Sequence, residues 1–238
     1  MPASGAVNRS TLRQQIADAL RDEVLAGRMR PRVEFTVRQI AEQYGVSATP
    51  VREALFDLSA QGLLESDQHR GFRVREFSVA DYRSMVKARA LVIDAAFRGV
   101  FDGSGAERRL LATHQAALVS VRRRAEEAVR AARGGDLDIL IGYDLRFWRE
   151  LGAVIGNPYI TEFLHRMRVQ AWVFAVPYLR GDADVCDWLW NGHQDLVEAI
   201  IAADGDAVRA VLDASYAHGL SWADRLAAGD PPHPGHGD

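Results

Sequence analysis

The chain has 238 residues, of which 48% are hydrophobic and 26% charged, a composition typical of folded proteins and long enough for two domains. No apolar run approaches the roughly 18 residues of a membrane-spanning helix, and no signal peptide is recognisable, so we expect a cytoplasmic protein without membrane contact. The single cysteine, Cys186, excludes an internal disulfide. The net charge of −3 excludes a strongly basic chain, so contact with a polyanion must depend on a few well-placed cations.

The stretch from Thr36 to Val74 has the layout of a winged helix-turn-helix. Thr36 is expected to cap a first short helix with one apolar face, and Gly45 to end it. Ser47 is expected to cap a second helix, which Gly62 closes. Two short strands, joined by a loop rich in turn-forming residues, follow this helix. Such a unit places its second helix in the major groove of double-stranded DNA.

Residues 10–75 resemble the N-terminal domain of the GntR family of bacterial transcription regulators. The matching motifs are, in chain order, Ile40-Ala41, Gly45-Val46-Ser47, Pro50-Val51-Arg52-Glu53-Ala54-Leu55, Gly62-Leu63-Leu64 and Arg70-Gly71. The resemblance implies a DNA-binding domain over residues 1–77. It implies DNA contacts from seven residues of the helices and the wing, namely Arg38, Ser47, Thr49, Arg52, His69, Arg70 and Gly71. Ala48 stands where the family usually carries Arg, so one usual contact is missing.

The physical chemistry of these side chains agrees with that assignment. Arg52 would project from the second helix toward a guanine edge or a phosphate, and Arg38 toward the phosphate backbone or a nearby base. Ser47 and Thr49 lie at a helix N-terminus, where free amides favour phosphate. The wing tip, His69 to Gly71, could reach the minor groove.

The rest of the chain is expected to be helical. Ser78, followed three residues later by Asp81, is typical of a capping box and marks the start of a second domain. The periodicity predicts helices over residues 79–101, 106–132, 136–155, 158–178, 184–203 and 206–227, each separated by Gly, Asn, Asp or Pro. We therefore expect a mainly α protein, with an all-α antiparallel bundle over residues 78–228 and a disordered tail over residues 229–238.

Three polar residues of the bundle are candidates for a common site. His193 lies 12 residues before Gly205 and His218 lies 13 residues after it, so in two antiparallel helices they fall at about the same height. Asp144 lies on another helix. One Asp and two His suit a divalent metal such as Zn²⁺. Chance is the alternative, because seven histidines will produce some paired heights.

The bundle resembles the FCD domain, the effector module of the FadR-type branch of the GntR family. Many members carry Asp-x-x-Phe-His followed by two later histidines, and these four polar groups bind a metal. Asp144-Leu145-Arg146-Phe147 matches this motif, as do His193 and His218, but Trp148 stands in place of the first histidine. An indole nitrogen carries a proton and has no lone pair for a metal.

Three interpretations of this site remain open. Asp144, His193 and His218 could hold a metal as three ligands, or they could hydrogen-bond an effector directly. Alternatively, Trp148 could fill the cavity and leave no effector site. Arg89, on the first bundle helix, resembles a family Arg and could pair with an effector carboxylate; a salt bridge between helices is equally consistent.

These patterns predict a ligand-responsive transcription regulator and not an enzyme. The resemblance implies a homodimer bound to near-palindromic operator DNA, a repressor more often than an activator, and control by a small carboxylate. One alternative is a metal-dependent enzyme with an accessory DNA-binding domain. Another is a constitutive DNA-binding dimer whose bundle only dimerises.

Overall fold

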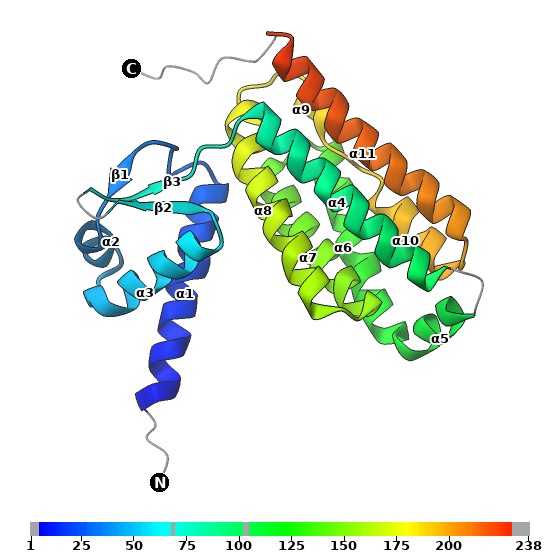
Figure 1. Cartoon of the computed structure of the whole chain (residues 1–238), viewed down its shortest axis with the longest axis horizontal. Coiled ribbons are helices and arrows are strands. Elements are labelled where there is room, and N and C mark those ends of the chain that lie inside the picture. The colour runs from blue at the N-terminus through cyan, green and yellow to red at the C-terminus, as the bar shows by residue number, and fades with distance from the viewer. Residues whose placement is uncertain (1–4, 68–69, 102–104, 230–238) are drawn as a thin grey trace. The chain divides into compact units, whose positions relative to one another are not determined.

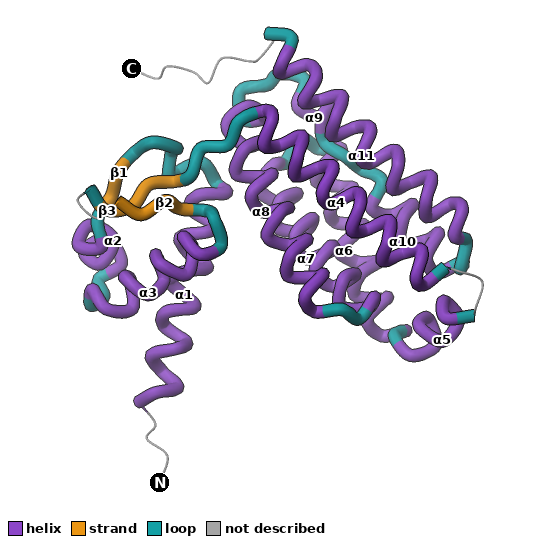
Figure 2. Tube along the Cα trace, viewed as in Figure 1, coloured by secondary structure: helices purple, strands orange, loops and turns teal. Residues whose placement is uncertain are grey.

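The computed structural model describes residues 5–67, 70–101 and 105–229, with side chains from Leu12 onward and without that of Ala106. The chain forms two compact units, Met1–Phe77 and Ser78–Asp238, and each is described by itself (Figure 1). The first combines helices with a small sheet, and the second is helical wherever it is regular (Figure 2). Within the described residues, no helix is long and apolar enough to cross a lipid bilayer.

The first unit is a winged helix-turn-helix. Its elements are α1 (Gly5–Leu25), β1 (Glu34–Phe35), α2 (Val37–Tyr44), α3 (Ala48–Ala60), β2 (Leu64–Asp67) and β3 (Gly71–Val74). Helix α3 packs against both α1 and α2. Its inner face, Val51, Ala54, Leu55 and Leu58, is fully buried, because apolar residues at this spacing share one side of a helix. The opposite face of α3 is therefore free to contact another molecule.

Both ends of α2 are formed as predicted, but the predicted side-chain cap at the start of α3 is not. Thr36 and Gln39 form a reciprocal capping box at the start of α2, and Gly45 ends the helix in the left-handed conformation with φ 64°. Ser47 occupies the N-cap position of α3, but its side chain makes no capping hydrogen bond. Its exposed hydroxyl is thus available to another partner.

The wing has one more strand than the sequence pattern predicts. Strands β2 and β3 form the expected antiparallel hairpin, and β1 pairs antiparallel with β3 on its other side, giving the order β1-β3-β2. Phe35 of β1 lies opposite Phe72 of β3, with ring centroids 6.4 Å apart. A two-residue strand carries no alternation that a sequence could display, which explains why β1 was not predicted.

The second unit contains eight helices among the described residues. They are α4 (Val79–Val100), α5 (Ala106–Thr113), α6 (Gln115–Arg133), α7 (Leu137–Ile155), α8 (Pro158–Leu179), α9 (Val185–Trp188), α10 (His193–Ile201) and α11 (Gly205–Ala227). The predicted capping box at the start of α4 is present, since Ser78 accepts from the Asp81 amide and the Asp81 carboxylate accepts from the Ser78 amide.

Two predicted helices are each divided, so those predictions were wrong. The helix expected over residues 106–132 breaks at His114, whose backbone leaves helical geometry and whose ring bonds the Leu110 carbonyl at 3.0 Å. The helix expected over residues 184–203 ends at Leu189, which is extended, and resumes after Gly192. The first break contains none of the residues that usually end a helix. The second contains Asn191-Gly192, a signal that the helical periodicity on either side outweighed.

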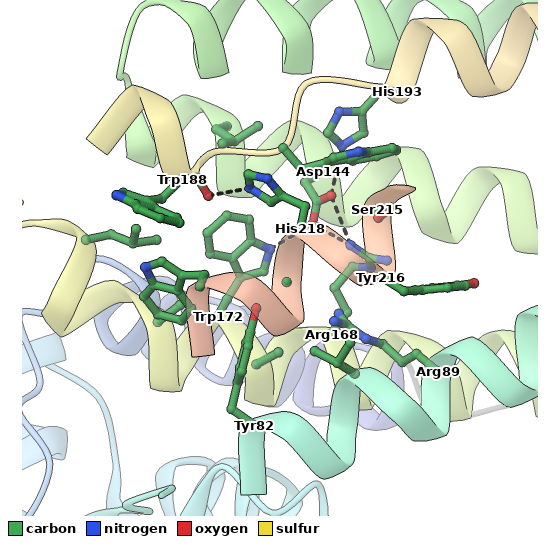
Figure 3. A pocket seen from close by; sticks show the side chains of 18 residues that line it. Tyr82, Arg89, Asp144, Arg168, Trp172, Trp188, His193, Ser215, Tyr216 and His218 are labelled. Carbon is green, nitrogen blue, oxygen red and sulfur yellow. Dashed lines mark hydrogen bonds and ion pairs between the residues drawn. The ribbon is translucent and has the colours of Figure 1, made fainter. Parts of the chain in front are cut away.

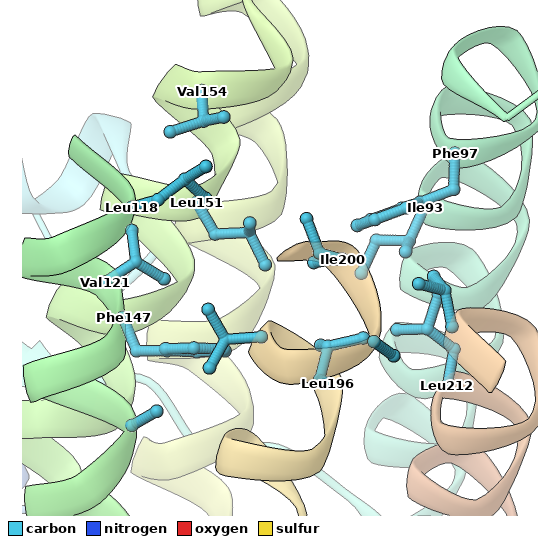
Figure 4. Packing of buried hydrophobic residues seen from close by; sticks show 14 residues of the cluster. Ile93, Phe97, Leu118, Val121, Phe147, Leu151, Val154, Leu196, Ile200 and Leu212 are labelled. Carbon is cyan, nitrogen blue, oxygen red and sulfur yellow. The ribbon is translucent and has the colours of Figure 1, made fainter. Parts of the chain in front are cut away.

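The long helices of this unit form a closed ring. In ring order α4, α8, α7, α6, α10 and α11, each helix packs against the next, and α11 packs against α4. Along one part of the helices, the inside of the ring is filled by a hydrophobic cluster that includes Ile93, Phe97, Phe147, Leu151 and Leu196 (Figure 4). Phe147 and Leu196 are wholly buried there. Along another part, the helices surround a pocket with polar side chains.

Candidate functional site

One groove of the first unit collects several of the predicted DNA contacts. It is bounded by α2, by the start of α3 and by the wing, and its lining includes Arg38, Ala48, Arg52 and Gly71. Arg52, Ser47, Ala48 and Thr49 are all exposed on α3. An exposed helix start beside a cationic groove is suited to a phosphate backbone and to base edges.

The cations of this face are held only by weak surface pairs. Arg38 is 88% exposed and lies 2.8 Å from Glu42, one turn later on α2. Arg70 lies 3.6 Å from Glu34, and both are well exposed. Such pairs contribute about 0–1 kcal/mol, so a phosphate can displace the carboxylate. His69 falls outside the described residues.

Gly71 has a structural requirement at the base of the wing. Its φ is +100°, and a Cβ there would lie 2.5 Å from the Phe35 carbonyl oxygen. Only glycine permits both the backbone angle and the close approach of β1 to β3. Gly71 therefore sets the position of the wing as well as lining the groove.

The second unit encloses a pocket inside its ring of helices (Figure 3). Its volume is about 90 Å³, and it is partly open to solvent. The lining comes from α4, α7, α8, α10 and α11 and from the segment around α9, and includes Tyr82, Arg89, Asp144, Arg168, Trp172, Trp188, Trp190, His193, Tyr216, His218 and Trp222. Four of the chain's five tryptophans line the pocket, and the fifth, Trp148, donates a hydrogen bond to the carboxylate of Asp144 in the pocket wall.

Asp144 is the centre of the polar network. It is buried, and its Oδ1 accepts from the Trp148 indole at 3.0 Å and lies 2.9 Å from Nε2 of His193. Its Oδ2 accepts from the Trp172 indole at 2.7 Å. The guanidinium of Arg168 bonds both oxygens, at 3.2 and 3.4 Å. The lone pairs of the carboxylate are thus occupied by four side chains from three helices.

The charges of this network follow from its surroundings. Burial by itself would raise the pKa of Asp144, but the charge of Arg168 and the hydrogen bonds from His193 and Trp172 outweigh it, so the pKa lies well below the ordinary value. Burial lowers the pKa of His193, against the opposing effect of Asp144. His193 is therefore neutral, and its Nε2–H donates to the ionised carboxylate.

Arg168 and Trp172 are the two partners that sequence reasoning missed. Arg168 lies over the ring of Trp148, with its guanidinium carbon 4.1 Å from the ring centroid, while it pairs with Asp144. Trp172 follows Arg168 by four residues, so both side chains leave α8 from one face. That spacing was the available signal, but α8 carries no motif that marks it.

Arg89 enters the pocket from α4 without a counterion. Within the described part of the chain, Arg89 makes no ion pair or hydrogen bond, whereas Arg168, which lines the same pocket, pairs with Asp144. Burial, and then the charge of Arg168, lower the pKa of Arg89 to about 10. Arg89 is therefore still charged at neutral pH, and the pocket holds two guanidinium groups for one carboxylate.

His218 lines the same pocket but does not join the network around Asp144. Its Nε2–H donates to the Trp188 carbonyl at 3.0 Å. His193 and His218 thus share a cavity, as their equal heights on two helices suggested, but each has a different partner.

The residues around Asp144 do not fit a resident metal ion. Its oxygens already accept from four donors, and one of these, Arg168, is a cation that would repel a metal. Nε2 of His193 faces the carboxylate and that of His218 faces a carbonyl. Among the described residues no group of three His, Cys, Asp or Glu could hold a metal ion. Of the three interpretations that the sequence leaves open, the three-ligand metal site is therefore the one that these side chains do not support.

Comparison with known proteins identifies both parts of the chain. The family described as "Bacterial regulatory proteins, gntR family" matches residues 7–74, and the FCD domain matches residues 95–218. A probable D-xylose utilization operon transcriptional repressor of Paenarthrobacter nicotinovorans is 27% identical over 206 residues, covering 87% of this chain and 86% of that protein. The HTH-type transcriptional regulator McbR of Escherichia coli strain K12 is 33% identical over 76 residues, covering 32% of this chain and 34% of McbR.

Solved structures show the same fold. The structure of E. coli McbR/YncC matches with a TM-score of 0.70 at 21% identity, covering 91% of this chain and 98% of that one. A GntR regulator from Rhodococcus sp. RHA1 matches with a TM-score of 0.62 at 20% identity, covering 88% and 97%. The two matched domains account for most of the chain, and it belongs to the GntR family of transcription regulators, with an FCD domain as its second unit.

Proposed function

We propose that this regulator is a homodimeric repressor that binds operator DNA through α3 and the wing and responds to a small carboxylate in the pocket of its FCD domain. The observation that carries the effector assignment is Arg89, a charged side chain without a counterion in an internal pocket. A charge taken out of water is costly unless it is paired, so a ligand carboxylate would relieve that cost.

The assignment of repressor follows the relative from P. nicotinovorans, whose name states that activity. That name also concerns D-xylose, a neutral sugar. The excess positive charge of this pocket supports an anion instead, because a sugar would leave Arg89 unpaired. The alternative of a metal-dependent enzyme has no support in the side chains around Asp144, which do not suit a metal.

Dimerisation follows from the logic of operator recognition. One winged unit reads one half-site, and two units related by a two-fold axis read a near-palindromic operator. An effector can alter operator affinity only if it binds the DNA-competent and DNA-incompetent arrangements with different affinities. We expect the carboxylate to favour one arrangement of the two DNA-binding units over the other.

Replacing Arg52 tests the DNA-binding part of this proposal. Operator DNA would first be selected from random duplexes with the full-length protein. Arg52→Ala should weaken binding to the selected duplex by about 1–3 kcal/mol, because a base contact is lost, as measured by fluorescence anisotropy at fixed salt.

Arg30→Ala is the matched control for this experiment. Arg30 is exposed in the same unit but does not line the groove. Its loss therefore removes the same charge as the loss of Arg52 without removing a contact in the groove. Equal effects of the two substitutions would show that Arg52 contributes only general electrostatic attraction. An unchanged affinity for Arg52→Ala would remove this residue from the recognition surface.

A further inference from the structure

We infer that this FCD domain has exchanged a metal ion for a guanidinium ion, and that its pocket binds a short monocarboxylate with an apolar body without any metal. The inference rests on the proposed effector function and specifies the ligand and how it is held. Four features of the pocket carry it: the Arg168–Trp148 pair, the excess charge, the division of the pocket into two ends, and its volume.

The first feature is the coupling between Arg168 and Trp148. Trp148 donates its indole N–H to Asp144 and presents its ring face to Arg168, 4.1 Å away. Arg168 in turn bonds Asp144. The indole that cannot ligate a metal thus holds in place a cation that supplies positive charge beside the same carboxylate. Arg168 is only 13% exposed, so this charge is a fixed part of the site.

The second feature is the number of charges. The ionised groups that line the pocket are Arg89, Arg168 and Asp144, with His193 neutral, which leaves one positive charge unbalanced. Asp144 has its hydrogen-bond sites taken by four other donors, and its single negative charge is not enough to balance both guanidinium groups. One added carboxylate brings the net charge of the pocket to zero, whereas a dianion would leave an uncompensated negative charge in a partly desolvated site.

The third feature is that the pocket has two different ends. Arg89 and Arg168 point into one end, and Trp172 and Trp188 lie toward the other (Figure 3). The apolar residues Ala175 and Leu179 also line the pocket, and they follow Trp172 along α8, away from Arg168 in the sequence. A ligand with a carboxylate at one end and an apolar body at the other matches both, since apolar surface gains free energy when it leaves water.

The fourth feature is size. The pocket of about 90 Å³ is smaller than an engineered cavity of about 150 Å³ that accepts benzene, so it encloses roughly four heavy atoms. Acetate has this size, and the partly open side leaves room for slightly longer acids such as propionate, which has one carbon more. The class assigned to the pocket is therefore the short-chain monocarboxylates.

Tryptophan fluorescence offers a direct test, because all five tryptophans lie in or beside the pocket and none lies in the DNA-binding unit. The full-length protein would be titrated with propionate, with its neutral isostere propionamide, with the dianion malonate and with D-xylose, at constant ionic strength. Propionate should bind at least tenfold more tightly than the other three, and EDTA should leave its affinity unchanged. Equal binding of propionamide or D-xylose, or loss of binding in EDTA, would overturn the inference.

Substitutions then assign the site. Arg89→Gln should weaken propionate at least tenfold, whereas Lys87→Gln, which removes an equal charge from the exposed face of α4, should not. Equal effects of these two changes would reduce the site to general electrostatics. If Arg89→Gln does not fold, Arg89→Lys keeps the charge but loses the fork, and should weaken propionate while leaving the melting temperature near that of the native protein.

Zinc alone tests whether Arg168 has displaced the metal. The native protein should not bind Zn²⁺ in calorimetry, and neither should Trp148→His, because Arg168 still occupies Asp144. Trp148→His combined with Arg168→Ala should gain zinc affinity at least tenfold over either single variant. Zinc binding by the native protein would contradict the exchange. If the double variant does not fold, the native and Trp148→His titrations still decide the question.

The outcome is separable from that of the proposed function. If propionate binds as expected but does not change operator affinity, the inferred site stands and the sensory role fails. If operator affinity responds to D-xylose and propionate does not bind, the sensory role stands and the inferred ligand class fails.

Discussion

A single buried carboxylate organises the effector end of this protein. Asp144 is 3% exposed at its side chain, and a charge placed there is tolerated only because four donors surround it. Two of these donors are indole N–H groups, which give hydrogen bonds without adding charge. The rigidity of the tryptophans therefore fixes the carboxylate, and the carboxylate in turn fixes Arg168 at the pocket wall.

Trp172→Phe measures the value of one of these donors. The change removes the 2.7 Å hydrogen bond to Asp144 and leaves a buried oxygen with one partner fewer, which should lower the free energy of unfolding by about 1–3 kcal/mol. Urea unfolding followed by tryptophan fluorescence reports on this unit alone. Trp190→Phe is the control, because Trp190 lines the pocket but makes no described hydrogen bond to Asp144. Similar losses for both variants would assign the effect to ring packing instead.

His193 predicts how stability depends on pH. Its pKa is lowered in the folded protein from an ordinary value of 6.5, so below that pH the unfolded chain binds more protons than the folded one. The free energy of unfolding should therefore fall from pH 7 to pH 5, by up to about 1.4 kcal/mol per pH unit. Asp144, whose pKa is also lowered, adds a further loss only at more acidic pH.

Thermal or urea unfolding at several pH values checks this prediction against His193→Gln. The glutamine amide can still donate to Asp144 but does not titrate in this range. The pH dependence should be shallower in the variant, and the other histidines contribute equally to both proteins. Parallel slopes would mean that folding does not shift the pKa of His193.

At the scale of elements, the wing depends on a contact that is distant in sequence. Strand β1 belongs to the segment between α1 and α2, and it pairs with β3 of the hairpin. Gly71 makes this possible, because any side chain there would meet the Phe35 carbonyl.

Gly71→Ala should destabilise the DNA-binding unit more than Gly45→Ala. Both residues have positive φ, so both substitutions carry the cost of about 1–2 kcal/mol for a left-handed alanine. Only the Gly71 site adds a clash, at 2.5 Å, whereas a Cβ at Gly45 meets nothing within 4 Å. Far-ultraviolet circular dichroism on heating would compare the two. An equal loss would show that β1 moves away without cost.

The elements were predictable where their signal is local. Caps and left-handed glycines, as at Thr36, Ser78 and Gly45, are decided by neighbouring residues, and the structure has them where the sequence placed them. The break at His114 has no Gly, Pro, Asn or Asp to mark it, so periodicity continued through it. The break after Leu189 does carry a local signal, Asn191-Gly192, which the apolar periodicity on either side outweighed.

The candidate site shows the same limit. The equal heights of His193 and His218 on two helices predicted that they share a cavity. Asp144 and Arg89, which the family resemblance also indicated, line the same pocket. Neither the helix heights nor the resemblance could show that Arg168 and Trp172, in the middle of α8, converge on the same carboxylate. That convergence depends on how α7 and α8 pack, which no local pattern records.

At the scale of the whole molecule, the proposed effector site and the DNA-binding surface belong to different units, so the proposal requires a coupling free energy between the two binding events. If propionate changes operator affinity by some factor, the operator must change propionate affinity by the same factor. We expect this equality within experimental error. Operator affinity would be measured by anisotropy with and without propionate, and propionate affinity by fluorescence with and without operator. Unequal factors would indicate a third linked event, such as dimer dissociation.

The covalent path between the two activities is short. Strand β3 ends at Val74, α4 is capped by Ser78, and Tyr82 already lines the pocket, eight residues after the wing. The three residues between strand and cap can extend over about 14 Å at most from Val74 to Ser78, and Phe77 among them is buried. The winged unit is therefore joined to the helical unit by a short segment. In the proposed homodimer, this short connection would make the helical unit set the spacing of half-sites that the two winged units can bridge, and a ligand that alters the first turns of α4 would change which operators they can bind.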